Sequence, residues 1–535
     1  MADAPNFLLF INDQHRADHL GCYGNDIVRT PHIDGLAANG TRFDRFYVAT
    51  PICMPNRGTL MTGRMPSLHG VRQNGIPLSR QAVTFTELLR AAGYRTALFG
   101  KSHLQSISAN PIKVGLPEPD PNRKQPPEML AEARRGQWAD GRYDQELPPT
   151  WNGEPGFEPE LPFYGFDEIA LAIGHGDRVT GHYSRWLAER HRDPDSLRGP
   201  DNALAPNRDI AAPQAWRTRI PEELYPTRFI AEKTTEFFDR QAAAGNDRPF
   251  FVQCSFPDPH HPFTAPGRYF DMYDPADIPT PAAFHHPKNK LPPHLAEMHR
   301  ERDEGRAQKN GQRAFACTEE EARHAVALNY GAITMIDDAI GNVLQSLADN
   351  GLADNTVVIF TTDHGDFMGD HQLMLKAALH YQGLIRVPCI WSDPTAADQP
   401  ASSDVYCGTL DIANSVLDRA GIAPFNGMQG RSLPAMAVSG EGHDGMVIEE
   451  DQRRGYMGFR PNFRERTLVA DNWRLTLYSQ AEWGELYDLT TDPNEFDNLW
   501  DAPSHAEKRA EMTERLARRM LDLADSSPLA TGHGP

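Results

Sequence analysis

Continuous apolar runs that end in polar residues recur along this chain and predict buried strands. The first run, NFLLFIN at residues 6–12, is followed by Asp13 and Gln14. Further runs of the same form span residues 96–100, 250–255 and 357–361. Short runs without a polar face are typical of the strands of a parallel sheet, which helices cover on both sides.

Helical periodicity alternates with these runs. An apolar pattern over residues 85–92 precedes the run at 96–100, and a long amphipathic pattern from residue 325 precedes the run at 357–361. Alternation of helices with apolar strands predicts an α/β fold, with a large, mostly parallel or mixed sheet sandwiched by helices.

Two stretches and the C-terminal part depart from this alternation. Residues of about 105–220 and 265–315 are rich in Pro and charge and show weak periodicity, so we expect irregular excursions that form the rim of a pocket. The pattern RTLVADNWRLTLYS at 466–479 predicts a β-hairpin, and residues 505–525 predict a charged amphipathic helix. We therefore expect a catalytic domain over 1–430 and a smaller α+β domain with an antiparallel sheet over 431–535.

Composition narrows the classes of partner. Lys and Arg number 53 against 73 Asp and Glu, a formal net charge of -20, which disfavours nucleic acid and anionic membranes as partners. A site for an anion must then gather cations locally. We find no apolar run of membrane-spanning length and no signal-peptide pattern near the N-terminus, so we expect a cytoplasmic protein without a membrane partner. The six cysteines are spread singly, which indicates neither a disulfide framework nor a Cys-x-x-Cys zinc site.

Polar side chains that could carry chemistry follow the predicted strands. Ligands of open α/β sheets bind beyond the carboxyl ends of the strands. Each group alone has an ordinary explanation as a helix cap, a solvated lysine or a turn, but together they favour a site. These residues are Asp13 and Gln14, Lys101 and His103, Asp258, His260 and His261, and Asp363, His364 and Lys376.

The residue types suggest a cation and an anion in one place. Asp13, Asp363 and His364, with the Gln14 amide, would offer mainly oxygen ligands and one nitrogen, which suits Ca²⁺, Mg²⁺ or Mn²⁺. Positive charge from arginine and lysine would hold a tetrahedral oxyanion. The candidates for that role are Arg57, Lys101 and Lys376.

One short stretch, TPICMPNRGTLMTGR at residues 50–64, holds Cys53, Pro55 and Arg57 at fixed offsets before a possible helix. The thiol of Cys53 is either a small buried side chain at a helix start, or a nucleophile or the precursor of one. The residues alone leave both readings open.

Several motifs in order resemble the type I sulfatases of the alkaline phosphatase superfamily. The segment Cys53 to Arg57 matches the family signature C-x-P-x-R. The resemblance extends over most of the chain, from residue 5 to about residue 500. The other matching segments are PNFLLFINDQHRADHLGCYGN, GRMPSLHGV, GYRTALFGKSH, DPHHPF, TTDHGDFMGDHQLMLK and ELYDLTTDPNEFDNL.

This resemblance implies a modified nucleophile. In that family a separate formylglycine-generating enzyme oxidises the signature cysteine, here Cys53, to Cα-formylglycine. One hydroxyl of the hydrated aldehyde attacks sulfur and displaces the alcohol, and loss of the proton from the other hydroxyl then expels sulfate.

The resemblance also implies a role for each matching residue. The metal ligands would be Asp13, Gln14, Asp363, His364 and the modified Cys53. Arg57 would orient the nucleophile, and His103 would take the proton during sulfate release. Lys101, His260 and Lys376 would bind the sulfate, with Asn74 as a further pocket residue, and either Lys376 or His260 would protonate the leaving oxygen.

Departures from the family pattern leave alternatives open. Gln14 and His364 stand where many members have an acidic residue and an asparagine, so we expect Ca²⁺ but also consider Mn²⁺. Related phosphonate monoester hydrolases and phosphodiesterases are the runner-up, and an unmodified anion binder is a third class. The pair Lys101 and His103 favours a sulfatase, because phosphonate hydrolases carry uncharged hydroxyl residues there. We expect a small anionic sulfate ester as substrate, with homo-oligomerisation left open.

Overall fold

The computed structural model describes residues 4–109, 120–127, 129–130, 133, 138, 140–154, 156–245, 248–530 and 532. A large sheet forms its centre and runs in the order β12-β2-β11-β9-β1-β7-β4-β5-β6. In that order its strands are Ser402–Ser403, Thr41–Phe43, Cys389–Ser392, Thr356–Thr362, Asn6–Asp13, Phe250–Pro259, Arg95–Gly100, Glu168–Ile173 and Thr180–Gly181.

The middle of this sheet is parallel. β9, β1, β7, β4 and β5 pair with one another in parallel, whereas β11 and β6 are antiparallel to their neighbours. All residues of β1, β7 and β9 are buried, as the unbroken apolar runs predict. Because the five strands are parallel and adjacent, their carboxyl ends meet at one edge of the sheet.

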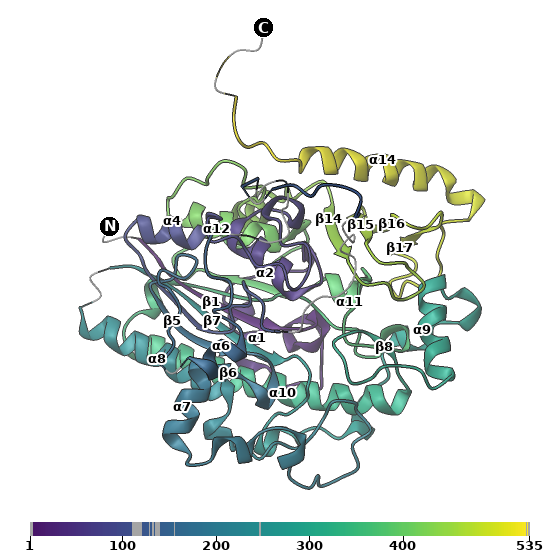
Figure 1. Cartoon of the computed structure of the whole chain (residues 1–535). Coiled ribbons are helices and arrows are strands. Elements are labelled where there is room, and N and C mark those ends of the chain that lie inside the picture. The colour runs from purple at the N-terminus through teal and green to yellow at the C-terminus, as the bar shows by residue number, and fades with distance from the viewer. Residues whose placement is uncertain are drawn as a thin grey trace.

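Helices cover both faces of the sheet (Figure 1). One hydrophobic cluster joins alternate residues of β1 to α2 (Cys53–Thr62), α4 (Phe85–Ala91) and α12 (Ile412–Arg419). The other joins the intervening residues to α1 (Pro31–Ala38), α7 (His182–Arg190), α8 (Pro226–Ala243) and α10 (Glu319–Asp349). Capping boxes at Thr84 and Thr318 fix the starts of α4 and α10.

The C-terminal part forms a separate antiparallel sheet in the order β14-β15-β16-β17. These strands span Met446–Gln452, Phe463–Ala470, Trp473–Tyr478 and Gly484–Asp488, and α14 (Ala506–Asp522) packs on one face. In Figure 1 this sheet and α14, in green to yellow, lie beside the large sheet. The predicted hairpin is β15–β16, which turns at Asp471 and Asn472 with positive φ.

These observations confirm the predicted fold class, but the two excursions are only partly irregular. The stretch 105–220 contributes β5 and β6 to the sheet, together with α6 (Pro148–Gly153) and α7. Its periodicity was weak because its helices are short and β5 is followed at once by Gly174, at φ +107. The stretch 265–315 contains α9 (Pro293–Asp303). Residues 110–119 of the first excursion lie outside the described residues.

The remaining short elements connect these layers. They are β3 (Phe46–Tyr47) with β13 (Cys407–Gly408), β8 (Phe315–Ala316) with β10 (Leu373–Met374), α3 (Pro66–His69), α11 (Gln382–Ile385) and α13 (Leu433–Ser439). Within the described ranges, no helix is both long and apolar enough to cross a lipid bilayer. The domain division at residue 431 stays a prediction, since one hydrophobic cluster includes residues from both sides of it.

Candidate active site

The residues predicted at strand ends come together at the carboxyl edge of the parallel strands. Asp13 is the last residue of β1, and Lys101 and His260 directly follow β4 and β7. Asp363 and His364 directly follow β9. Because β9, β1, β7 and β4 are neighbours in the sheet, these five buried side chains share one location.

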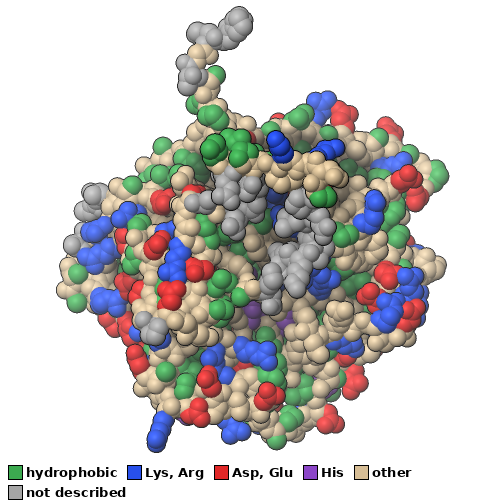
Figure 2. All heavy atoms as spheres, in the orientation of Figure 1, with side chains coloured by type: hydrophobic (Ala, Val, Ile, Leu, Met, Phe, Trp, Pro, Cys, Tyr) green, Lys and Arg blue, Asp and Glu red, His purple; other side chains and the backbone are tan. Residues whose placement is uncertain are grey.

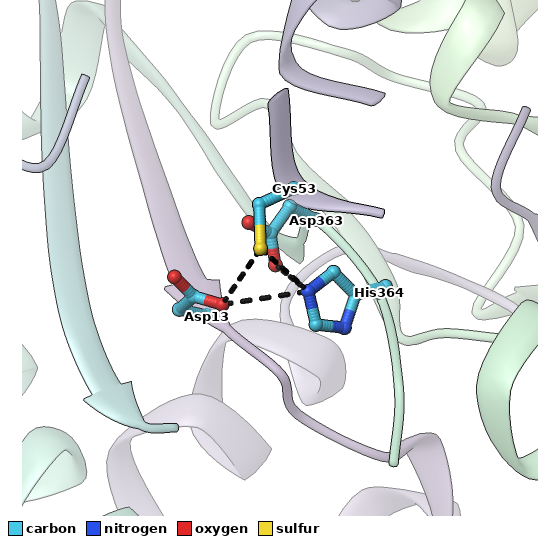
Figure 3. Close-up of side chains that lie close together, drawn as sticks. All are labelled: Asp13, Cys53, Asp363 and His364. Atoms are coloured by element: carbon cyan, nitrogen blue, oxygen red, sulfur yellow. Dashed lines mark hydrogen bonds and ion pairs between the residues drawn. The ribbon is translucent and has the colours of Figure 1, made fainter. Parts of the chain in front are cut away.

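Cys53, the first residue of α2, completes this group. Pro55 is tolerated there because the N–H groups of the first helical turn have no partner within the helix. The Cys53 Sγ lies 3.1 Å from His364 Nε2, 2.9 Å from Lys376 Nζ and 3.9 Å from Asp13 Oδ1. Figure 3 shows the side chains of Cys53, Asp13, Asp363 and His364 converging. The motif cysteine is therefore at the centre of the site.

These four residues have the donor set of a metal site. One ligand atom from each lies within 4.8 Å of the others, and all four residues are buried. His364 Nδ1 is 2.9 Å from the Gly365 carbonyl oxygen, which fixes the ring proton on Nδ1 and leaves the Nε2 lone pair directed inward. Two carboxylates and one imidazole, with the side chain of residue 53 beside them, can hold a divalent cation.

Burial would raise the pKa of Asp13, but the positive charges of Lys101 and Lys376 hold it well below its usual range. The carboxylate of Asp13 is therefore ionised, as a metal ligand must be.

Gln14 also reaches the site, in a left-handed conformation with φ +62. Its Oε1 accepts a hydrogen bond from Lys376 Nζ at 3.1 Å, its Nε2 donates to Asp366, and its backbone N–H donates to Asp363 Oδ1 at 3.2 Å. The amide oxygen thus faces the cluster and the amide nitrogen faces away from it. This orientation is compatible with the predicted role of Gln14 as a ligand, which stays a prediction.

Arg57 lies one helical turn after Cys53 and is buried beneath the site. Its Nε donates to Asp363 Oδ2 at 2.8 Å, and its Nη1 donates to the Lys101 carbonyl and to Ser255 Oγ, each at 3.0 Å. Arg57 therefore connects α2 to the residues directly after β9 and β4 and to Ser255 within β7. Its Nη2 has no hydrogen-bond partner.

Two lysines place further positive charge in the site. Lys376 Nζ lies 3.0 Å from His260 Nε2 and 2.9 Å from His364 Nε2, in addition to its contact with Cys53. Lys101 Nζ donates to Asp13 Oδ2. With Arg57, three buried cations surround the position of the predicted nucleophile, in a protein whose net charge is -20.

His175 belongs to the site, although the sequence analysis did not single it out. Its Nε2 is 2.7 Å from Lys101 Nζ and 3.6 Å from Asp13 Oδ2, and its ring stacks on His260 with centroids 3.7 Å apart. Burial lowers the pKa of His175 to about 4 and that of His260 well below its usual range, so both rings are neutral. His175 follows β5, so the strand-end rule finds it once that stretch is recognised as a strand.

His103 and Asn74 are less directly connected. His103 is buried with φ +57, its backbone N–H donates to Glu146 Oε2 at 2.7 Å, and its Nδ1 has no hydrogen-bond partner. Burial and the charge of Lys101 keep the pKa of His103 well below its usual range, so the ring is a neutral proton acceptor. Asn74 Oδ1 accepts from the backbone N–H of Met54, beside Cys53.

The side chains of the site are almost fully buried. In Figure 2 histidine side chains are visible at the centre of the face, among Lys and Arg side chains on the surface around it. The arrangement can hold a cation, bind a small oxyanion through lysines and imidazoles, and present the side chain of residue 53 to that anion.

Comparisons with known proteins agree with this geometry. The family model described as "Sulfatase" matches residues 5–422, and that described as "N-sulphoglucosamine sulphohydrolase, C-terminal" matches residues 369–522. An arylsulfatase of Clostridium perfringens is 26% identical over 99% of this chain and 98% of its own. A multifunctional alkaline phosphatase superfamily protein of Trinickia caryophylli is 25% identical over 97% and 96%.

Among solved structures, the phosphonate monoester hydrolase of Agrobacterium radiobacter superposes with a TM-score of 0.75 at 24% identity, covering 98% of this chain and 97% of its own. At that identity the likeness concerns the fold.

Proposed function

This chain belongs to the sulfatase family of the alkaline phosphatase superfamily, and from that premise we propose that it hydrolyses sulfate esters with a Cα-formylglycine formed from Cys53 and one bound divalent cation. The observation that carries the proposal is the position of Cys53. Its Sγ lies among two carboxylates, an imidazole and a lysine. A reactive side chain at that point faces the cation, the anion-binding groups and the proton-transfer groups at once.

The modified residue and the cation would supply complementary chemistry. The hydrated aldehyde offers an oxygen nucleophile with a second hydroxyl, and a divalent cation held by Asp13, Asp363, His364 and Gln14 offers Lewis acidity. We expect Ca²⁺, with Mn²⁺ as the alternative, because the donors are mainly oxygen with one imidazole. A formylglycine-generating enzyme, or an equivalent, would act on Cys53 during maturation.

The remaining roles, which are to stabilise residue 53 and to bind the sulfate, belong to side chains of the protein. Arg57 would stabilise negative charge that develops on residue 53, because it is bonded to Asp363, a member of the same cluster as Cys53. Lys101, His260 and Lys376 would bind the sulfate oxygens, and His175 extends this group because it contacts Lys101 and stacks on His260.

Lys376 is the better candidate for the acid that protonates the leaving oxygen. It carries a charge and its Nζ contacts Cys53 Sγ directly, whereas the neutral ring of His260 contacts Lys376. His103, with its neutral ring and an Nδ1 without a partner, suits the role of base in sulfate release.

A comparison of substrates tests the reaction. Purified protein, shown by mass spectrometry to carry formylglycine, is assayed with an aryl sulfate, a phosphonate monoester and a phosphodiester that share one leaving group. These substrates are chosen because the relatives of this chain include an arylsulfatase and a multifunctional alkaline phosphatase superfamily protein. We expect the highest kcat/KM for the sulfate, because Lys101 and His103 provide a cation and a base where phosphonate hydrolases have hydroxyl groups.

The control is Cys53→Ala, which should be inactive on all three substrates, since the covalent step is lost. A higher kcat/KM for the phosphonate than for every sulfate ester tested would reject the sulfatase proposal and favour the runner-up.

A further inference from the structure

A second buried group of metal-ligating side chains lies outside the catalytic site. We call His380, Glu450 and Glu465 the His380 cluster. His380 follows Lys376 by four residues, and Glu450 and Glu465 are directly opposite each other on β14 and β15. The exposed fractions are 0% for His380, 2% for Glu450 and 1% for Glu465. Two carboxylates and an imidazole are thus enclosed between the loop that carries Lys376 and the C-terminal sheet.

The separations within the cluster match those of ligands around one metal ion. His380 Nε2 is 3.0 Å from Glu465 Oε1 and 3.8 Å from Glu450 Oε2, and one ligand atom from each residue lies within 4.8 Å of the others. Zinc-type bonds to nitrogen and oxygen are about 2.0–2.2 Å, which puts neighbouring ligand atoms roughly 3–3.6 Å apart. The three side chains are therefore arranged around a point rather than paired.

The polar atoms that face this point lack other partners. Both carboxylate oxygens of Glu465, Oε2 of Glu450 and Nε2 of His380 make no hydrogen bond, although all are buried. His380 Nδ1 lies 2.7 Å from Thr467 Oγ1. A proton on Nδ1 donated to that hydroxyl leaves the Nε2 lone pair for a metal, the orientation that partners of metal-ligating histidines commonly enforce.

The two nearby arginines form their ion pairs with other acidic residues. Arg474 is committed to Glu485 at 3.0 Å and to Glu495, and Arg466 Nη2 is 3.1 Å from Asp451 Oδ1. In the described part of the chain, neither carboxylate of the cluster has an arginine as a direct hydrogen-bond partner.

We propose that His380, Glu450 and Glu465 bind a divalent first-row transition-metal ion, Mn²⁺ or Zn²⁺, in a closed structural site. The cluster has only three protein ligands and lacks the further amide and residue-53 oxygens proposed for the catalytic site, so it suits these ions better than Ca²⁺, which takes more oxygen ligands. The ion would cross-link the loop after Lys376 to β14 and β15. The site is independent of the reaction proposed above, because none of its ligands belongs to the group around Cys53.

Metal stoichiometry of the full chain tests this proposal. Protein is stripped with a chelator, loaded with Mn²⁺ alone or Zn²⁺ alone, desalted and analysed for metal per chain. We expect about one more equivalent in the native protein than in Glu465→Gln, which removes a ligand charge while it preserves the shape of the side chain. Loss of the ion should also lower the apparent Tm by several degrees, because an ion bound by the folded state stabilises it.

The matched control is Glu449→Gln, the same substitution one position before Glu450. Glu449 accepts hydrogen bonds from the backbone N–H and hydroxyl of Ser67 and lies outside the cluster. It should keep both the metal content and the metal-dependent Tm. Glu450→Gln provides a second ligand variant if Glu465→Gln fails to fold.

Asp363→Asn distinguishes the two proposed sites. This variant should lose the metal ion of the catalytic site and keep the metal ion that depends on Glu465. Native protein with the same metal content as Glu465→Gln under both loading conditions would overturn the inference and leave the proposed reaction untouched.

Discussion

Cys53 differs from the other buried cysteines in its surroundings. Burial raises the pKa of the Cys254 thiol on β7 to about 12. At Cys53, burial acts in the same direction, but the charge of Lys376 outweighs it and lowers the pKa of the thiol. The same charges would stabilise an oxyanion once the side chain is an aldehyde hydrate.

We therefore predict that active protein carries an aldehyde at position 53. Mass spectrometry of the peptide that spans Cys53 should show the formylglycine mass and capture by a hydrazine reagent. The peptide that contains Cys254 is the internal control and should keep its thiol. A fully active preparation with only free thiol at position 53 would contradict the prediction.

Lys101 provides a test of anion binding. Its ammonium group is buried against Asp13 and His175, so a bond from it to a sulfate oxygen would form in a site with little water. Such a charge-assisted bond contributes about 2–4 kcal/mol to the transition state, so Lys101→Ala should lower kcat/KM for an aryl sulfate by roughly 30- to 1000-fold. Lys288→Ala, at an exposed lysine, is the control. A loss below about threefold would show that Lys101 does not act on the substrate.

Asp363 connects the metal to the anion-binding residues, because one oxygen faces the metal cluster and the other accepts from Arg57. Asp363→Asn should lose about one equivalent of divalent metal per chain together with activity, since a neutral amide is a weaker ligand. Elemental analysis of the native protein and of Asp363→Asn measures the metal content per chain. Asp354→Asn, at an exposed position, is the control. Undiminished metal in Asp363→Asn would refute the assignment. Zinc as the lost ion would contradict the expectation of Ca²⁺ or Mn²⁺.

At the scale of the elements, the apolar runs predicted the bounds of the strands closely, because a strand buried on both faces has an unbroken run of apolar residues. The run at 6–12 corresponds to β1 and the run at 357–361 to β9, each within one residue at either end. β7 extends four residues beyond its predicted end at Ser255, to Pro259. The extension contains polar and proline residues, which pair with the end of β1 beyond a register shift.

The parts of the site that the sequence did not predict depend on tertiary contacts. His175 joins the group because β5 pairs with β4, and nothing in the local pattern of 105–220 indicated that pairing. The His380 cluster needs a loop and two strands brought together from positions up to 85 residues apart. Asp13, Lys101, His260, Asp363 and His364, in contrast, were found because each lies at the end of a strand or just after it.

The close approach of β4 to β7 at the end of β4 fixes the position of Lys101 in the site. Gly100 has φ +110, and a Cβ there would lie 1.9 Å from the carbonyl oxygen of Ser255 on the neighbouring strand. The same oxygen accepts the backbone N–H of Lys101, which sets the direction of the lysine. This close approach of β4 and β7 requires a residue without a side chain.

Gly100→Ala should therefore destabilise the protein by at least about 2 kcal/mol and displace Lys101. Thermal unfolding and kcat/KM for an aryl sulfate measure the two effects. The matched control is Gly35→Ala in α1, where a Cβ meets nothing within 4 Å, and there the stability should rise by about 0.5–1 kcal/mol. Equal Tm values for Gly100→Ala and the native protein would contradict the argument.

At the scale of the whole molecule, the C-terminal sheet is built into the large domain. Met446, Ile448 and Phe463 belong to the same hydrophobic cluster as residues of α2 and of the large sheet. Hydrogen bonds cross the boundary as well: Glu449 N donates to the Ala49 carbonyl at 2.8 Å, and Tyr381 Oη donates to Glu485 Oε1 at 2.6 Å. Removing either part would expose apolar surface and leave buried polar groups without partners.

We therefore predict that a chain ending at residue 430 will not fold by itself, although the sequence pattern divides there. It would lack β14 and β15, and also Tyr456 between them, whose hydroxyl accepts a hydrogen bond from the backbone N–H of Ala378. Expression should give aggregated protein, or a compact state that binds a hydrophobic dye and unfolds without a cooperative transition.

A chain ending at Ser526, which keeps α14, is the control and should unfold cooperatively. Coexpression of residues 1–430 and 431–535 should restore soluble protein, because the two halves share one core. If the chain ending at residue 430 is monodisperse alone and unfolds in one cooperative step, the predicted boundary separates independent folding units and the shared cluster is only an interface.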